Sequence, residues 1–122
     1  MNKSVSTTSS SEDVYSEYIK HENVSGTIIL DYSVSAIHLL IINDDTTILA
    51  SRIPSGKQMY IYVYNMNSCE ITLEGRFGRE TTIDSTHEKQ LITAYNHIGG
   101  DISYTVNQVY VNILGIDYNV NA

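Results

Sequence analysis

The chain has 122 residues, with 7 basic and 14 acidic side chains, a formal net charge of −7 and one cysteine. This length fits a single domain with a modest core, and the acidic charge argues against a nucleic-acid or membrane-surface partner, because such partners require clustered Lys and Arg. A single cysteine excludes an intrachain disulfide and a cysteine-based zinc site.

The first 22 residues are predicted to form an N-terminal arm for attachment or assembly, followed by a β-domain over residues 23–122. Residues 4–11 are a Ser/Thr tract that lacks the apolar side chains needed for a core. The first 16 residues contain no apolar stretch of the kind found in secretory signals, so we do not expect secretion.

The second half of the arm, residues 12–22, carries an apolar stripe at i, i+4 spacing. The stripe favours one short helix, and an extended arm fits the same residues. We expect the apolar side chains of the stripe to contact a neighbouring subunit; they are Val14, Tyr15, Tyr18 and Ile19.

From residue 23 onwards the sequence is a series of short runs rich in Ile, Val, Thr and Tyr, with turn signals every 8–12 residues or so, roughly as in sandwiches and barrels. Residues 36–43 and 46–53 are two such runs, and Asn43-Asp44-Asp45 between them is predicted to be a hairpin turn. No helical pattern alternates with the runs, which excludes a parallel α/β sheet. We therefore predict an all-β fold, a single antiparallel β-sandwich that is jelly-roll-like or a small barrel, with an extended or short helical N-terminal arm.

One predicted strand, residues 59–64, alternates without interruption between two kinds of side chain, which a strand points to opposite faces. The predicted core face is Met59, Ile61 and Val63, and the opposite face is Tyr60, Tyr62 and Tyr64. We interpret the tyrosine face as a subunit interface, because Tyr supplies a large rigid ring with a polar group. A second inner face of the fold and a sugar-binding face are the alternatives. Residues 65–68 are predicted to close a hairpin after this strand.

Residues able to support catalysis or metal binding are present, but not in a pattern typical of a site. The histidines show no metal-binding spacing; they are His21, His38, His87 and His97. His38 lies in an apolar run and is interpreted as a satisfied histidine, and Cys69 as a buried structural thiol. Asn43-Asp44-Asp45 lacks the spacing of a calcium loop. We therefore expect no enzymatic activity, no cofactor and no bound metal.

The order of motifs over residues 25–78 resembles a β-domain of bacteriophage fibre and related virion proteins. The motifs are Gly26, Leu30-Asp31-Tyr32-Ser33, Asp45-Thr46-Thr47, Pro54-Ser55-Gly56 and Ile71-Thr72-Leu73-Glu74-Gly75. Each motif alone is ordinary strand or turn chemistry, so their order carries the resemblance. The chain departs from the family in lacking a long shaft and a large receptor-binding tip. This departure favours a head fibre, a capsid-decorating protein or a tail-fibre adaptor.

The resemblance implies a structural protein located in the virion and assembled in the host cytoplasm. It implies a homo-oligomer, with a trimer favoured, that contacts other virion proteins such as capsid, portal, tail or fibre proteins through its N-terminal arm. The alternative is a carbohydrate- or receptor-binding module of the same fold, with a host-surface glycan as its ligand. Neither function requires nucleic acid, a membrane or a cofactor.

Overall fold

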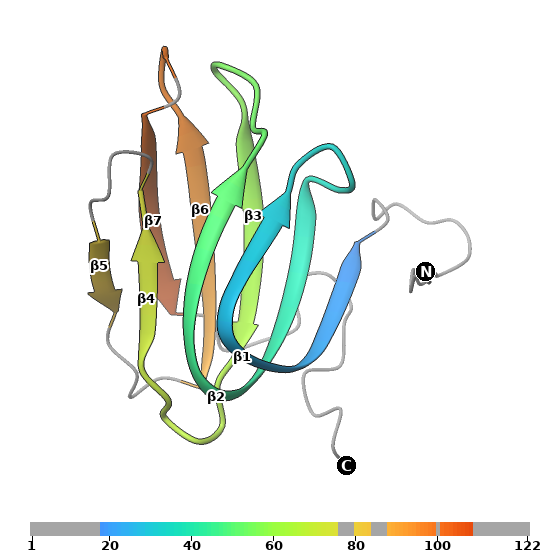
Figure 1. Cartoon of the computed structure of the whole chain (residues 1–122), viewed down its shortest axis with the longest axis vertical. Coiled ribbons are helices and arrows are strands. Elements are labelled where there is room, and N and C mark those ends of the chain that lie inside the picture. The colour runs from blue at the N-terminus through green and yellow to red at the C-terminus, as the bar shows by residue number, and fades with distance from the viewer. Residues whose placement is uncertain (1–17, 76–79, 84–87, 100, 109–122) are drawn as a thin grey trace.

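The computed structural model describes residues 18–75, 80–83, 88–99 and 101–108, and these residues form seven β-strands and no helix (Figure 1). The predicted all-β class is confirmed for this part of the chain. The described residues contain no helix long and apolar enough to cross a membrane. In chain order the strands are β1 (Ile19–Asp31), β2 (Ile37–Ser51), β3 (Gln58–Tyr64), β4 (Ile71–Glu74), β5 (Glu80–Ile83), β6 (Lys89–Asn96) and β7 (Ile102–Gln108).

β1 begins at Ile19, inside the segment predicted to be an N-terminal arm. Ile19 and His21 pair with residues of β2, so residues 19–22 form part of an extended strand rather than a helix. The rest of the predicted helix, including Val14 and Tyr15, lies outside the described residues.

The strands form one sheet in the order β5-β4-β2-β3-β6-β7, with β1 also paired to β2. The β1–β2, β2–β3 and β2–β4 pairs are parallel, whereas β3–β6, β4–β5 and β6–β7 are antiparallel. The predicted antiparallel sheet is therefore wrong for every pair that involves β2. The sheet curls around its core into a nearly closed barrel (Figure 1).

The parallel pairs arise because β2 is one strand of 15 residues that doubles back on itself (Figure 1). Its residues 37–41 pair with β3, and its residues 46–49 pair with β4. The two halves run in opposite directions on opposite sides of the core. Asn43-Asp44-Asp45 therefore lies at the bend of a continuous strand, and the prediction that it is a hairpin turn is wrong.

β1 follows the same bend beside β2, in parallel register on both halves. The register shifts between His21 and Val24, and again between Val24 and Gly26. Asn23 and Gly26, at these shifts, have φ angles of 56° and 69°, in the left-handed region that extended strands do not use. Such bulges bend a strand, which allows β1 to turn with β2.

The core consists of apolar side chains from both sides of the bend. β3 contributes the three residues predicted for its core face, all fully buried, which are Met59, Ile61 and Val63. β2 contributes side chains from both of its halves: Leu40, Ile42, Ile48 and Ala50. Each large apolar side chain buried in this way contributes about 1.5–3 kcal/mol, so the core holds the two halves of the bent strand together.

The loop between β3 and β4 is held by the side chain of Asn65, which is 1% exposed. Nδ2 of Asn65 donates to the carbonyl of Cys69, and Oδ1 accepts from the N–H of Cys69, both at 2.9 Å. Cys69 itself is buried, as predicted. The loop does not close a hairpin, because β3 pairs with β2 and β6 whereas β4 pairs with β2 and β5. The hairpin predicted at residues 65–68 is therefore wrong.

Replacing Asn65 with Ala should lower the free energy of unfolding by about 2 kcal/mol, because two buried backbone groups of Cys69 would lose their partner. Urea unfolding followed by circular dichroism measures the change. Asn67→Ala, an exposed position in the same loop, is the matched control and should change the free energy by less than about 0.5 kcal/mol. Equal losses in the two variants would contradict the role given to Asn65.

Candidate functional site

The tyrosine face of β3 forms a second apolar cluster, on the opposite side of the strand from the core; we call it the tyrosine cluster. Its buried members are Leu39, Tyr62 and Tyr64, and its partly buried members are Tyr18, Ile37, Ile41, Tyr60 and Leu91. Tyr62 pairs with Leu39 of β2 and with Leu91 of β6. Paired residues of neighbouring strands point to the same face, so the register brings these side chains together.

The three tyrosines differ in how much surface they keep within the single chain. Tyr62 and Tyr64 are each 5% exposed, and burial, with a smaller effect of Tyr60, raises the pKa of the Tyr62 hydroxyl. Tyr60 is only partly buried, and Nε2 of Gln58 donates to its hydroxyl at 2.5 Å. The burial of Tyr62 and Tyr64 fits the alternative of a second inner face, and it leaves Tyr60 as the tyrosine that another molecule could contact.

Tyr18 is the residue of the predicted arm that the structure brings to the tyrosine cluster, directly before β1. Ile19 is half-buried at the first position of β1. Val14 and Tyr15 lie outside the described residues. The assignment of these residues and of the tyrosine face to a subunit interface therefore stays a prediction.

His21 and His38 form a pair that their spacing in the sequence does not predict. In the parallel register Ile19 pairs with His38 and His21 pairs with Leu40, which places the two imidazoles side by side. Nε2 of His21 lies 3.0 Å from Nδ1 of His38, and the rings stack with centroids 5.3 Å apart. Nε2 of His38 lies 2.9 Å from the Ser35 carbonyl, which can only accept, so Nδ1 of His38 accepts the hydrogen bond from His21. The interpretation of His38 as a satisfied histidine is confirmed.

The burial of this pair sets the direction of its titration. Burial lowers the pKa of His38, and burial followed by the proximity of His38 lowers the pKa of His21 to about 4. In the unfolded chain a histidine titrates near pH 6.5. Between these values the unfolded state binds more protons, so the pair contributes stability that is present above about pH 6.5 and is lost as the pH falls towards about 4.

Lowering the pH from about 7 to about 5 should reduce the free energy of unfolding by about 1 kcal/mol through His21, after allowance for its partial exposure to solvent. His21→Gln should weaken this pH dependence, because the amide still donates to His38 but does not titrate. Urea unfolding at each pH measures the effect. His97→Gln, at an exposed position after β6, is the control and should keep the dependence. A wild-type stability that is constant over this range would contradict the prediction.

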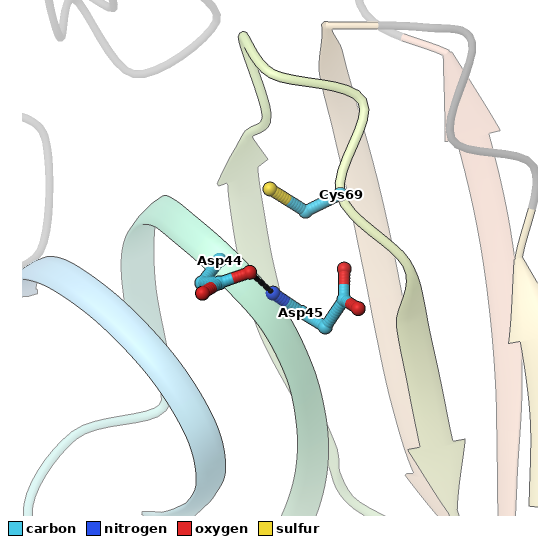
Figure 2. A group of neighbouring side chains, drawn as sticks. All are labelled: Asp44, Asp45 and Cys69. Carbon is cyan, nitrogen blue, oxygen red and sulfur yellow. Dashed lines mark hydrogen bonds between the residues drawn. The ribbon is translucent and has the colours of Figure 1, made fainter.

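Asp44, Asp45 and Cys69 meet where the bend of β2 approaches the loop between β3 and β4 (Figure 2). Their ligand-type atoms all lie within 4.8 Å of one another. Oδ1 of Asp44 accepts from the N–H of Asp45, and Oδ1 of Asp45 accepts from the N–H of Glu70, both at 2.8 Å. Burial, and then the two carboxylates, raises the pKa of the Cys69 thiol. The two carboxylates accept hydrogen bonds from the backbone at the bend of β2 and in the loop before β4. A cation such as zinc would have to displace the thiol proton of Cys69 to bind there.

The loops that follow β1, β2 and β6 gather at one end of the molecule, at the top of Figure 1, which we call the loop end. The N–H of Gly56 donates to the Asn96 carbonyl at 2.8 Å, and this bond connects the loop after β2 to the end of β6. Val34 and Ile98, in the loops after β1 and β6, are 62% and 92% exposed. Loops held by a rigid sheet are a common place for binding residues.

A pocket of about 390 Å³ opens between the end of β2, the end of β6 and the start of β7. It is lined by Leu49, Ala50, Ser51, Arg52, Ile53, Asn96 and Ile102. The volume lies within the range of roughly 300–1,000 Å³ that is usual for small-ligand sites. No sequence motif predicts this pocket, because its lining comes from separate segments of the chain.

Arg52 and Asn96 supply the polar groups of the pocket. Arg52 has a φ of 63°, a strained conformation for a residue with a side chain, and its Nε lies 3.5 Å from Oδ2 of Asp31. Asn96 is 6% exposed, and its Nδ2 donates to the Ile53 carbonyl. Oδ1 of Asn96 is buried and has no hydrogen-bond partner among the described residues.

Comparison with protein-family models, with curated proteins and with solved structures finds no match to this chain. The likeness to phage fibre domains therefore depends on the motif order of residues 25–78. The features of the chain that bear on its function are that order, the tyrosine cluster and the loop end.

Proposed function

We propose that this chain is a structural subunit of a bacteriophage particle, namely a small fibre, decoration or adaptor protein that forms a homo-oligomer. In this proposal residues 1–22 attach the subunit to a neighbouring virion protein, and the two halves of the bent strands act as the two layers of a β-sandwich. The motif order of residues 25–78 and the tyrosine cluster support it. The resemblance favours a trimer over other oligomers.

The tyrosine cluster is the observation that carries the proposal. It lies on the face of β3 opposite the core, it includes Tyr18 at the end of the arm, and Tyr60 keeps exposed surface beside it. Tyrosine combines a large ring with a hydrogen-bonding hydroxyl and is enriched at the centres of protein interfaces. A neighbouring subunit that covered Tyr60 would extend this cluster, while Tyr62 and Tyr64 continued to support the fold.

Tyr60→Glu should weaken self-association about tenfold or more while the monomer stays folded, because a charge would replace an interface anchor. Tyr62→Glu should instead unfold the domain, because its carboxylate would be buried without a partner. Sedimentation velocity measures association and circular dichroism measures folding. Tyr60→Phe is the conservative control and should associate like the wild type. A wild-type chain that stays monomeric at high concentration would count against the proposal.

Deleting residues 1–17 should abolish attachment to the particle and leave the β-domain folded, because the deletion ends before β1. Co-sedimentation of the truncated chain with particles measures attachment, and circular dichroism checks the fold. Attachment at the wild-type level would remove the arm from the proposed mechanism.

A receptor- or carbohydrate-binding module is the second candidate, and the pocket at the loop end is the observation that favours its receptor-binding form. Stacking of sugars on the tyrosine face has less support, because Tyr62 and Tyr64 are buried within the chain. A chain that stays monomeric and binds a host-surface glycan would favour this candidate over the first.

A further inference from the structure

We propose that the pocket at the loop end binds the carboxyl terminus of a partner polypeptide whose last residue is aliphatic. The inference goes beyond the assembly role and does not depend on it. The pocket offers a separate group for each part of such a ligand: a guanidinium for the carboxylate, a buried acceptor for the peptide N–H, and an aliphatic wall for the side chain.

Arg52 supplies the group that binds the carboxylate. Its Nε faces Asp31 at 3.5 Å, and this leaves the two terminal nitrogens of the guanidinium for a bidentate contact with a second carboxylate. Lys57 lies in the same loop. The Lys and Arg residues among the described ranges are Lys20, Arg52, Lys57 and Lys89. In a chain of net charge −7, the loop after β2 therefore concentrates positive charge and favours an anionic ligand.

Asn96 supplies the acceptor. The Ile53 carbonyl can only accept, so the amide nitrogen of Asn96 must face it, and this sets the orientation of Oδ1. A buried carbonyl oxygen without a donor is costly, and Oδ1 has none among the described residues. A ligand N–H reaches this buried oxygen only when the wall of the pocket shifts on binding, and the new hydrogen bond then removes the cost. Asn96 therefore selects a ligand that carries a donor as well as a carboxylate.

The remaining wall is aliphatic and includes Leu49, Ala50, Ile53 and Ile102. A branched aliphatic side chain fits such a wall through apolar burial. The lining contains no aromatic ring on which a sugar could stack. Together with Arg52 and Asn96, the wall therefore fits the last residue of a peptide better than a monosaccharide.

The surroundings of the pocket favour a polypeptide over a free amino acid. Ile98, between the pocket residues Asn96 and Ile102 in the chain, is 92% exposed, and Val34 of the neighbouring loop is 62% exposed. Exposed apolar side chains near a pocket offer area that a longer ligand can bury. The residues that precede the terminal one in a partner chain would cover these side chains.

The test is a titration of the full-length chain with an acetylated glycyl-glycyl-leucine peptide that has a free carboxylate, followed by amide chemical shifts. The shifts should centre on Arg52, Ile53, Asn96 and Ile102. The same peptide with a terminal amide should bind at least about tenfold more weakly, because it lacks the charge-assisted hydrogen bonds. N-acetyl-leucine should also bind more weakly than the peptide, because it does not reach Val34 and Ile98.

Substitutions in the pocket test the same contacts by changing the protein in place of the peptide. Arg52→Gln should weaken binding of the peptide about tenfold. Lys89→Gln, which removes a charge at the opposite end of β6 from Asn96, is the matched control and should bind like the wild type. If Arg52→Gln alters the spectrum of the free chain, Ile102→Phe takes its place and should abolish binding by filling the pocket.

Three results would overturn the proposal. The first is an absence of shifts at about 10 mM peptide, a concentration that reveals a Kd of about 1 mM. The second is equal affinity for the peptide acid and its amide. The third is a methyl glucoside or N-acetyl-leucine that shifts the pocket amides when the peptide does not. These readouts do not involve self-association, so such a failure would leave the assembly proposal in place.

Discussion

The bend of β2 is the constraint on which the rest of the structure depends. One continuous strand passes from one side of the core to the other, so β3 and β4 pair with different halves of it and both run parallel to their half. The bend is held from inside by apolar side chains on both halves. From outside, Asp45 accepts a hydrogen bond from Glu70 and ties the bend to the loop before β4.

The strand β3 is packed on both faces. Met59 and its alternating neighbours face the core, while Tyr62 and Tyr64 are buried on the opposite face. The surface that this strand leaves for other molecules lies at Gln58, which is exposed, and at Tyr60, which is partly buried. The contacts that we propose with partners are therefore assigned to the margin of the tyrosine cluster and to the loop end, where the sheet holds Arg52 and Asn96 in one pocket.

The candidate sites were only partly predictable because their residues meet through pairing between distant segments. The burial of Cys69 was predictable because the residue precedes an apolar strand and because free cysteine is among the most buried residue types. His21 and His38 share no recognisable spacing, and they meet only because β1 and β2 run parallel. The pocket has the same origin, since its polar groups come from the ends of two strands that are not consecutive. No local pattern encodes such a juxtaposition.

The sequence by itself determined the all-β class and the two faces of β3, because side-chain alternation is a property of the extended backbone and needs no knowledge of partners. The tertiary structure alone decided which strands pair and in which direction. The residue types of Asn43-Asp44-Asp45 favour a turn both in a hairpin and in a bent strand. Whether a turn closes a hairpin or bends a continuous strand depends on what the flanking runs pair with, and in this chain both runs pair with β1 along their length. That choice rests on the combined burial of distant strands, which no short stretch of sequence contains.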